Sequence, residues 1–231
     1  VVEDTKAGTI YVDNIRFGYN GTVFATEKIW IDTDTTVTDE FEGFGIQWDP
    51  SDLYTYTDEQ WATFVERASF LKPNMMRVMI HDADSYCIGF TANNEPIYDW
   101  DSVLMKRLYR ILDFAEENNI PVMIGEWNGP SDRGYLSYDE YGKTLTWDSQ
   151  GWSDMIVDCL DYLTTEKGYT CLRYYNMINE PQFRGGHSAT TQNTWKNAIK
   201  TLRATMDASN NESIKKIEIV GPDVYSGWES W

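Results

Sequence analysis

Three consecutive residues, Asn179, Glu180 and Pro181, carry the side chains best suited to chemistry in this sequence. They follow a run rich in Tyr and Ile that is typical of a β-strand. Proline has no backbone N–H to donate, so strand pairing should stop near Pro181 and leave Glu180 at the carboxyl end of the strand. Parallel sheets and barrels place their chemistry at that end. A carboxyl group there, beside an amide and among aromatic residues, is a candidate general acid; the alternative is a surface glutamate that ends a strand.

A second candidate, Arg77, interrupts the apolar run from Met75 to Ile80. Such a run is typical of a strand that is covered on both faces. A buried guanidinium needs an anionic partner. Arg77 therefore belongs either to a site or to an ion pair of the core.

Other polar and aromatic residues follow the ends of predicted strands, where they could contact a ligand. Trp and Tyr rings stack on flat apolar faces such as those of sugar rings, although packing at the rim of the sheet is the alternative for each. The predicted substrate-binding residues are Trp48, Arg77, His81, Glu126, Trp127, Asn179, Tyr225 and Trp228. His187 is a weaker candidate of the same kind. No cluster has the spacing of a metal site, and we predict neither a metal nor a cofactor.

Strands and helices alternate along the chain from about residue 41. The predicted strands end at these candidate residues and occupy residues 43–48, 75–80, 121–125, 173–180 and 217–220. Four helices with one apolar stripe each separate them, at about residues 58–71, 102–118, 152–168 and 195–206. Thr57 and Gln60 form a capping box at the first helix. This βαβ alternation predicts an α/β fold with a parallel sheet.

A (β/α)8 TIM barrel fits the alternation better than a doubly wound sheet, because no Gly-rich phosphate turn follows the first strand. Eight units need roughly 250 residues. Only the first five βα units are therefore expected within the 231 residues.

Composition excludes several classes of partner. The net charge is −18, with the acidic residues scattered along the chain. Nucleic acids and anionic membranes bind clustered Lys and Arg, so we expect neither as a partner. The sequence has no apolar run long enough to cross a bilayer. Ten Trp and fifteen Tyr in an acidic chain suggest an extracellular protein that acts on glycans.

The three cysteines, Cys87, Cys159 and Cys171, are too few and too irregular for a disulfide framework. We expect buried free thiols, with a single disulfide as the alternative. The chain begins at Val1 without an initiator Met, as a processed or excised segment would.

The first forty residues differ in pattern from the rest. Residues 8–17 alternate as a strand does, and their Tyr-Val-Asp-Asn-Ile-Arg-Phe line resembles the last strand of jelly-roll carbohydrate-binding modules. The alternative is a hairpin that caps the following domain. We therefore predict a terminal β segment over 1–20, a connector with a short strand at Ile29–Ile31 over 21–40, and an incomplete barrel over 41–231.

Five motifs in strand order carry a wider resemblance, from about residue 41 to the end. They are Gly43-Phe44-Gly45, Arg77, Glu126-Trp127, Asn179-Glu180-Pro181 and Gly221-Pro222-Asp223. Together they resemble clan A glycoside hydrolases, the retaining (β/α)8 enzymes that include the family 5 cellulases and family 39 xylosidases.

The resemblance implies roles for three residues. Glu180 would be the acid/base, Asn179 would bind the hydroxyl next to the reacting carbon, and Arg77 would brace the nucleophile and keep it ionised. The implied protein is a secreted β-glycoside hydrolase that acts on β-linked plant-type polysaccharides or oligosaccharides by double displacement.

The clan's nucleophile is a glutamate at the end of the seventh strand, which this sequence does not contain. Glu126, Asp223 and Glu229 are poor substitutes, since each is better explained as a binding group or a solvated loop charge. We expect no activity from the chain alone, and the remaining barrel segment to lie on the same or another chain. The alternatives are a non-catalytic carbohydrate-binding protein on a degenerate barrel, and a barrel enzyme of unrelated chemistry that uses Glu180 as a proton shuttle.

Overall fold

The computed structural model describes residues 2–5, 9–12, 29–30, 43–50, 56–80, 83–130, 145–182 and 188–224. The chain divides into two compact units, Val1–Glu42 and Gly43–Trp231.

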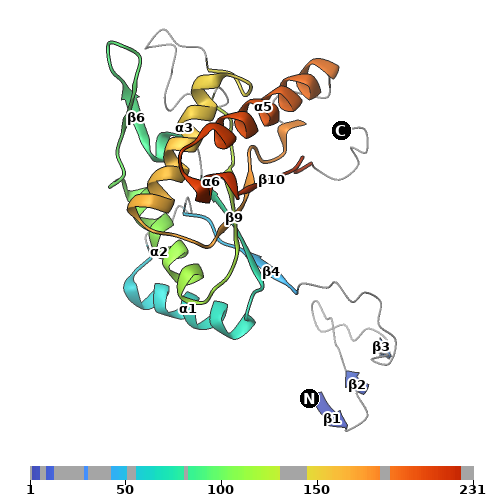
Figure 1. Cartoon of the computed structure of the whole chain (residues 1–231). Helices are drawn as coiled ribbons and strands as arrows, with labels where there is room; N and C mark the ends of the chain where they lie inside the picture. The colour runs from blue at the N-terminus through green and yellow to red at the C-terminus, as the bar shows by residue number, and fades with distance from the viewer. Residues whose placement is uncertain are drawn as a thin grey trace, which may run out of the picture. The chain divides into compact units, whose positions relative to one another are not determined.

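The first unit contains a small antiparallel sheet (Figure 1). Its strands are β1 (Val2–Thr5), β2 (Thr9–Val12) and β3 (Ile29–Trp30), and β2 lies between the other two. Strands β2 and β3 lie within segments predicted as strands, whereas β1 was not predicted. The rest of the predicted strand, from residue 13, lies outside the described residues, and its likeness to a carbohydrate-binding module stays a prediction.

The second unit is built on a sheet of five parallel strands. They are β4 (Gly45–Gln47), β5 (Met75–Ile80), β8 (Val122–Glu126), β9 (Leu172–Asn176) and β10 (Glu218–Val220). Their order, β10-β9-β8-β5-β4, puts each strand beside the next one along the chain. Successive neighbouring strands joined by helices are the arrangement of a barrel, and a doubly wound sheet would reverse its order part-way. The fold prediction of the first five units of a (β/α)8 barrel is confirmed.

The helices follow the strands as predicted (Figure 1). They are α1 (Asp58–Leu71), α2 (Val103–Glu117), α3 (Gln150–Asp161), α5 (Ala189–Ala208) and the short α6 (Glu212–Lys215), and a π-helical turn, η3 (Tyr162–Glu166), extends α3. The capping box of Thr57 and Gln60 is present, and the Ser102 hydroxyl accepts the Met105 N–H at the start of α2. None of the described helices is long and apolar enough to cross a membrane.

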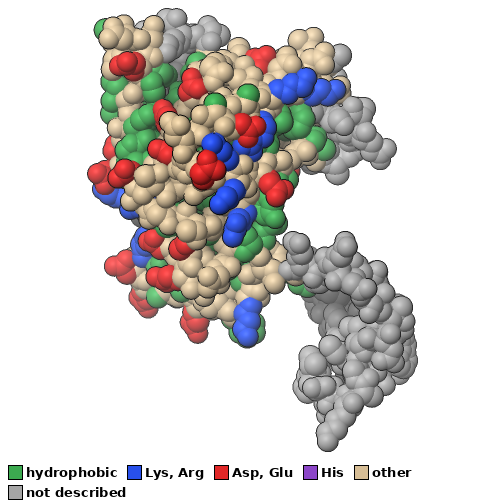
Figure 2. All heavy atoms as spheres, in the orientation of Figure 1, with side chains coloured by type: hydrophobic (Ala, Val, Ile, Leu, Met, Phe, Trp, Pro, Cys, Tyr) green, Lys and Arg blue, Asp and Glu red, His purple; other side chains and the backbone are tan. Residues whose placement is uncertain are grey.

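The core lies between the sheet and the helices. Alternate strand residues such as Val78, Ile80 and Ile124 pack there against the apolar stripes of α2 and α3. All three cysteines are buried free thiols, as expected. Acidic side chains are spread over the visible face of the second unit, while basic ones gather around α6 and α5 (Figure 2).

A hairpin between β5 and α2 was not predicted. It follows a short 3-10 turn, η1 (Ala83–Ser85), and pairs β6 (Cys87–Phe90) with β7 (Pro96–Tyr98). The Trp100 ring stacks between Tyr98 and Tyr162, at centroid distances of 4.6 and 4.4 Å. This aromatic stack attaches the hairpin to the turn that extends α3.

Candidate active site

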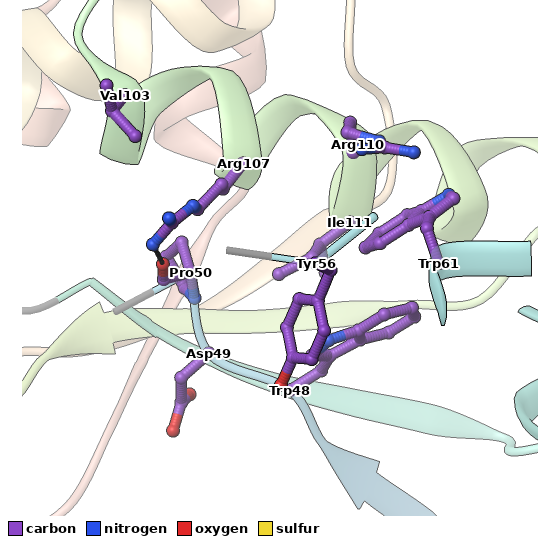
Figure 3. A pocket seen from close by; sticks show the side chains of 9 residues that line it. All are labelled: Trp48, Asp49, Pro50, Tyr56, Trp61, Val103, Arg107, Arg110 and Ile111. Carbon is purple, nitrogen blue, oxygen red and sulfur yellow. Dashed lines mark hydrogen bonds between the residues drawn. The ribbon is translucent and has the colours of Figure 1, made fainter. Parts of the chain in front are cut away.

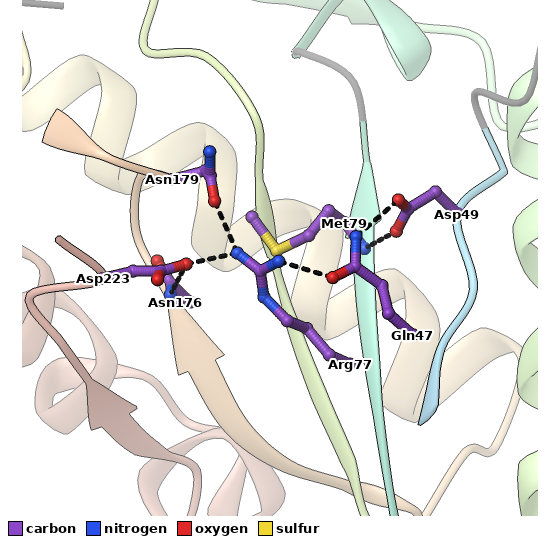
Figure 4. A network of polar contacts seen from close by, with 7 residues as sticks. All are labelled: Gln47, Asp49, Arg77, Met79, Asn176, Asn179 and Asp223. Carbon is purple, nitrogen blue, oxygen red and sulfur yellow. Dashed lines mark hydrogen bonds and ion pairs between the residues drawn. The ribbon is translucent and has the colours of Figure 1, made fainter. Parts of the chain in front are cut away.

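Arg77 is the centre of a polar network at the carboxyl ends of the strands (Figure 4). Its neighbours in β5, Met76 and Val78, pack into the core, so the strand alternation turns Arg77 to the opposite face of the sheet. The Nη2 atom forms an ion pair with the Asp223 carboxylate. This partly buried cation therefore has the anionic partner that was predicted for it.

Three strands besides β5 supply acceptors to this guanidinium. Nη1 donates to Gln47 Oε1 at 2.6 Å, and Nη2 donates to Asn179 Oδ1, also at 2.6 Å. Gln47 ends β4, Asn179 follows β9, and Asp223 follows β10. Arg77 thus ties together the ends of strands that are far apart in sequence.

Asp223 connects this network to Glu180. Its carbonyl oxygen accepts the Glu180 N–H at 2.9 Å, while its Oδ2 accepts a hydrogen bond from Asn176 Nδ2 at 3.2 Å. Asn176 lies opposite Gly125, where an added Cβ would sit 2.2 Å from the Asn176 carbonyl oxygen, so only glycine lets the two strands approach this closely. Asn176 was not predicted as a site residue, and Asp223 was considered only as a binding group or a solvated loop charge.

Glu180 lies beyond the carboxyl end of β9, because regular pairing stops at Asn176 and not, as predicted, close to Pro181. The strand ends at Asn176, and the last contact to β10 is the isolated bridge between Asn179 and Asp223. Glu180 has a φ of 48°, a left-handed conformation that is unfavourable for a residue with a Cβ and is common at functional sites. Its side chain is half-buried, and none of the described residues hydrogen-bonds its carboxylate.

Trp127 lies on the same side as Arg77. Its backbone N–H donates to the Ile80 carbonyl oxygen at 2.9 Å. The centroid of its ring is 5.4 Å from Arg77 Cζ, within the range of a cation–π contact. Trp127 therefore lies beside Arg77, and its contact with a ligand stays a prediction.

Glu126, in contrast, points to the other face of the sheet. It pairs with Ile80, whose side chain lies in the core, and it is only 1% exposed. Its Oε1 accepts hydrogen bonds from the hydroxyls of Tyr86 at 3.1 Å and Tyr175 at 3.3 Å. A residue in this position cannot reach a substrate at the open ends of the strands, which corrects our assignment of Glu126 as a binding group.

Two groups close to Glu126 have strongly raised pKa values. Burial, followed by the negative charge of Glu126, raises the pKa of the Cys159 thiol well above its ordinary value. The same two causes raise the pKa of Tyr175. Both groups are therefore neutral, and the Tyr175 hydroxyl remains a hydrogen-bond donor to Glu126. Through its backbone, Glu126 still supports the site, because its carbonyl oxygen accepts the Asn179 N–H at 2.9 Å.

Trp48 also lies on the helix side of the sheet (Figure 3). It is 8% exposed, and its ring stacks on Trp61 at 4.6 Å. The guanidinium of Arg110 lies 4.4 Å from the centroid of Trp61. Both rings line a cavity of about 230 Å³ between β4, α1 and α2. The Trp48 ring therefore packs between helices and has no free face for a sugar at the strand ends, contrary to our expectation.

The other residues that were predicted to bind a ligand lie outside the described residues. They are His81, His187, Tyr225 and Trp228, together with Glu229. Within the described ranges, no group of three or more Cys, His, Asp or Glu residues could hold a metal ion.

Two further residues of the network, Gln47 and Asp49, were missed by the sequence analysis. Gln47 Nε2 donates to Asp49 Oδ2 at 2.8 Å, and Asp49 Oδ1 accepts the Met79 N–H at 2.9 Å. Their position at the end of the first barrel strand was the available signal, since polar residues there face the same opening as Arg77.

Neither a protein-family model nor a curated protein sequence matches this chain. Among solved structures, it is similar to a monomeric β-xylosidase from Caulobacter crescentus CB15, with a TM-score of 0.56 and 18% identity over 81% of this chain and 37% of that one. A GH39 enzyme from Xanthomonas axonopodis pv. citri aligns with a TM-score of 0.55 and 13% identity over 83% of this chain and 37% of that one.

A GH39 β-xylosidase from Caulobacter crescentus gives a TM-score of 0.54 and 17% identity over 81% of this chain and 41% of that one. The chain thus spans about two-fifths of the length of these enzymes. At this identity the likeness shows the fold. The chain shares part of the (β/α)8 barrel fold of these structures.

Proposed function

We propose that the chain is part of a retaining β-glycoside hydrolase in which Glu180 is the acid/base. The observation that carries the proposal is the position of Asn179 and Glu180 at the carboxyl end of β9, joined to Arg77 through Asn179 Oδ1 and to Asp223 through the Glu180 N–H. Barrels of this fold carry their chemistry at that end. The structures with this fold named above are β-xylosidases and a GH39 enzyme.

In the proposed reaction, Glu180 first protonates the oxygen of the leaving group and then, as a base, activates the water that releases the sugar. The nucleophile is a glutamate outside this sequence, about 5 Å from Glu180 in a retaining site. Arg77 braces that carboxylate and keeps it ionised.

Asn179 has a defined orientation for this role. Its Oδ1 accepts from Arg77, so its amide nitrogen is the end left to face a substrate. An N–H donor there suits the hydroxyl next to the reacting carbon, and hydrogen bonds to that hydroxyl strengthen in the transition state.

The test uses a parent protein that carries the rest of the barrel, in wild-type form and as Glu180→Gln. Aryl β-glycosides, with the β-xyloside first because of the named neighbours, and soluble xylan, β-glucan and mannan serve as substrates. Removing a general acid should cost 10²- to 10⁴-fold on polymers and much less on aryl glycosides, whose leaving groups need no proton. Glu117→Gln, at an exposed position in α2 on the outside of the barrel, is the matched control and should change neither rate.

Equal rates of the wild type and Glu180→Gln on polymers would remove the acid/base assignment. A parent that binds these glycans without cleaving any would instead favour a carbohydrate-binding protein on a degenerate barrel. As part of the proposal, the substrate is a β-linked plant-type polysaccharide or oligosaccharide, and the protein works outside the cell without a nucleic acid or membrane partner.

A further inference from the structure

Beyond the end of the pairing between β4 and β5, the Asp49 carboxylate takes over from the backbone of β4 as the hydrogen-bond acceptor for β5. The last residues of β4 and β5 that pair are Gln47 and Arg77. One more backbone hydrogen bond follows, in which the Trp48 N–H donates to the Arg77 carbonyl oxygen at 3.0 Å. The next β5 donor on that side is the Met79 N–H, and Asp49 Oδ1 accepts it at 2.9 Å. The carboxylate is therefore anchored to the backbone of the strand that carries Arg77.

This anchor fixes the orientation of the Gln47 amide. Asp49 Oδ2 accepts from Gln47 Nε2 at 2.8 Å, so the donor end of the amide is already committed. An amide has one acceptor oxygen and one donor nitrogen. The Gln47 oxygen must then face Arg77, and it accepts from Nη1 at 2.6 Å. If the amide turned over, its NH2 group would face the guanidinium.

We propose that Asp49 is a positioning residue that acts through Gln47 to fix the guanidinium plane of Arg77. Gln47 holds Nη1 from the β4 side, while Asn179 and Asp223 hold Nη2 from the side of β9 and β10 (Figure 4). A planar guanidinium that is held at both nitrogens cannot rotate without breaking one set of contacts. What the fixed cation does in catalysis rests on the proposed function, whereas its orientation is a property of this chain alone.

The hydrogen-bond logic can be tested by exchanging the two side-chain types. Asp49→Asn leaves one acceptor where two donors, Met79 N–H and Gln47 Nε2, now compete. Gln47→Glu places two carboxylates in contact. The double substitution Asp49→Asn/Gln47→Glu restores a matched set, because the new amide can accept from Met79 and donate to the new carboxylate, which accepts from Arg77. Asp58→Asn is the matched control, as it removes an exposed carboxylate that pairs with Arg110 on the same unit.

The readout is the ¹⁵N–¹H spectrum of the arginine guanidinium groups in the 231-residue chain, with Arg77 assigned by the signals lost in Arg77→Lys. We expect separate, sharp Nη signals in the wild type, the control and the double variant, and merged or broadened signals in both single variants. Wild-type signals in both single variants, or a double variant as disordered as the singles, would overturn the proposal.

Activity of the parent protein provides an independent arm. Because small misplacements of a site group can cost on the order of 10²-fold in rate, kcat should fall by about that factor in each single variant and recover in the double variant, while KM changes little. If the spectra behave as expected but the wild-type parent cleaves no glycoside, the proposed function fails and the positioning role of Asp49 stands. If the parent is active and no single variant alters the spectra, only the positioning role fails.

Discussion

At the scale of single residues, the role of a polar side chain depends on the face of the strand from which it projects. Arg77 faces the open end of the half-barrel, whereas Glu126, at the end of the neighbouring strand β8, faces the helices. Both were predicted as ligand-binding residues, Glu126 because it follows a predicted strand end and Arg77 because a charged residue interrupts an apolar strand. The position of a residue at a strand end predicts the edge of the sheet at which it lies, but not the face. The face depends on the pairing register, since a shift of one residue turns a side chain over.

Tyr175 is expected to stabilise the fold through Glu126. A buried carboxylate that loses one hydrogen-bond donor retains its desolvation cost, so Tyr175→Phe should lower the free energy of unfolding by about 1 to 3 kcal/mol. Urea unfolding of the wild type and of Tyr175→Phe at neutral pH measures this difference in the free energy of unfolding. Tyr174→Phe is the control from the adjacent position, on the opposite face of β9, and should change stability by much less. Equal effects of the two substitutions would show that the hydroxyl of Tyr175 contributes nothing specific.

At the scale of elements, prediction succeeded where the signal is local. Helix α1 and strand β5 have the predicted bounds because a capping box, an apolar stripe and an apolar run are all encoded in adjacent residues. The hairpin of β6 and β7 was missed because its strands are short and are held by the stacking of Trp100 on distant rings. The network around Arg77 was found only in part, since the contacts of Gln47 and Asp223 with it join residues 30 and 146 positions apart.

Glu116 fastens the end of α2 to the start of β9, and this joint should depend on pH. Its carboxylate accepts from the N–H groups of Thr170 and Cys171, each at 2.8 Å. Burial alone would raise the pKa of Glu116, but the hydrogen bonds from Thr170 and Cys171 outweigh it, and the pKa lies below the ordinary 4.5. A carboxyl whose folded pKa is depressed contributes stability above its unfolded pKa and loses it as the pH falls through the folded value.

Glu116→Gln should therefore lower the urea midpoint at pH 7 and lose this effect progressively as the pH falls below about 4.5. Urea titrations at several pH values, followed by circular dichroism, measure the difference from the wild type. Glu117→Gln, at the next and exposed position, is the control and should give no such trend. A deficit of Glu116→Gln that stays constant down to pH 3 would mean that charge plays no part in the joint.

At the scale of the whole second unit, none of the described residues pairs with the outer edge of β4 or of β10 in the five-stranded sheet. A barrel removes its edges by closing, and strand edges that remain open tend to pair with other chains. Along the free side of β4, a groove of about 500 Å³ is lined by Ile46, Phe64 and Leu71. Phe44, just before β4, is 81% exposed, and Leu71 is 63% exposed. Apolar groups in a closed barrel would be covered at this place by the strand and helix that complete it.

The isolated chain is therefore expected to self-associate through the groove beside β4, and a parent that carries the remaining units is expected not to. Sedimentation velocity over a range of concentrations measures this. Leu71→Lys should shift the distribution toward monomer, because a charge on the groove must lose its hydration when a second chain covers it. Val103→Lys is the control, since Val103 is equally apolar and 66% exposed but belongs to α2 and does not line this groove. A chain that is monomeric at every concentration would contradict the expectation. A Val103→Lys variant that dissociates as readily as Leu71→Lys would place the association elsewhere on the surface.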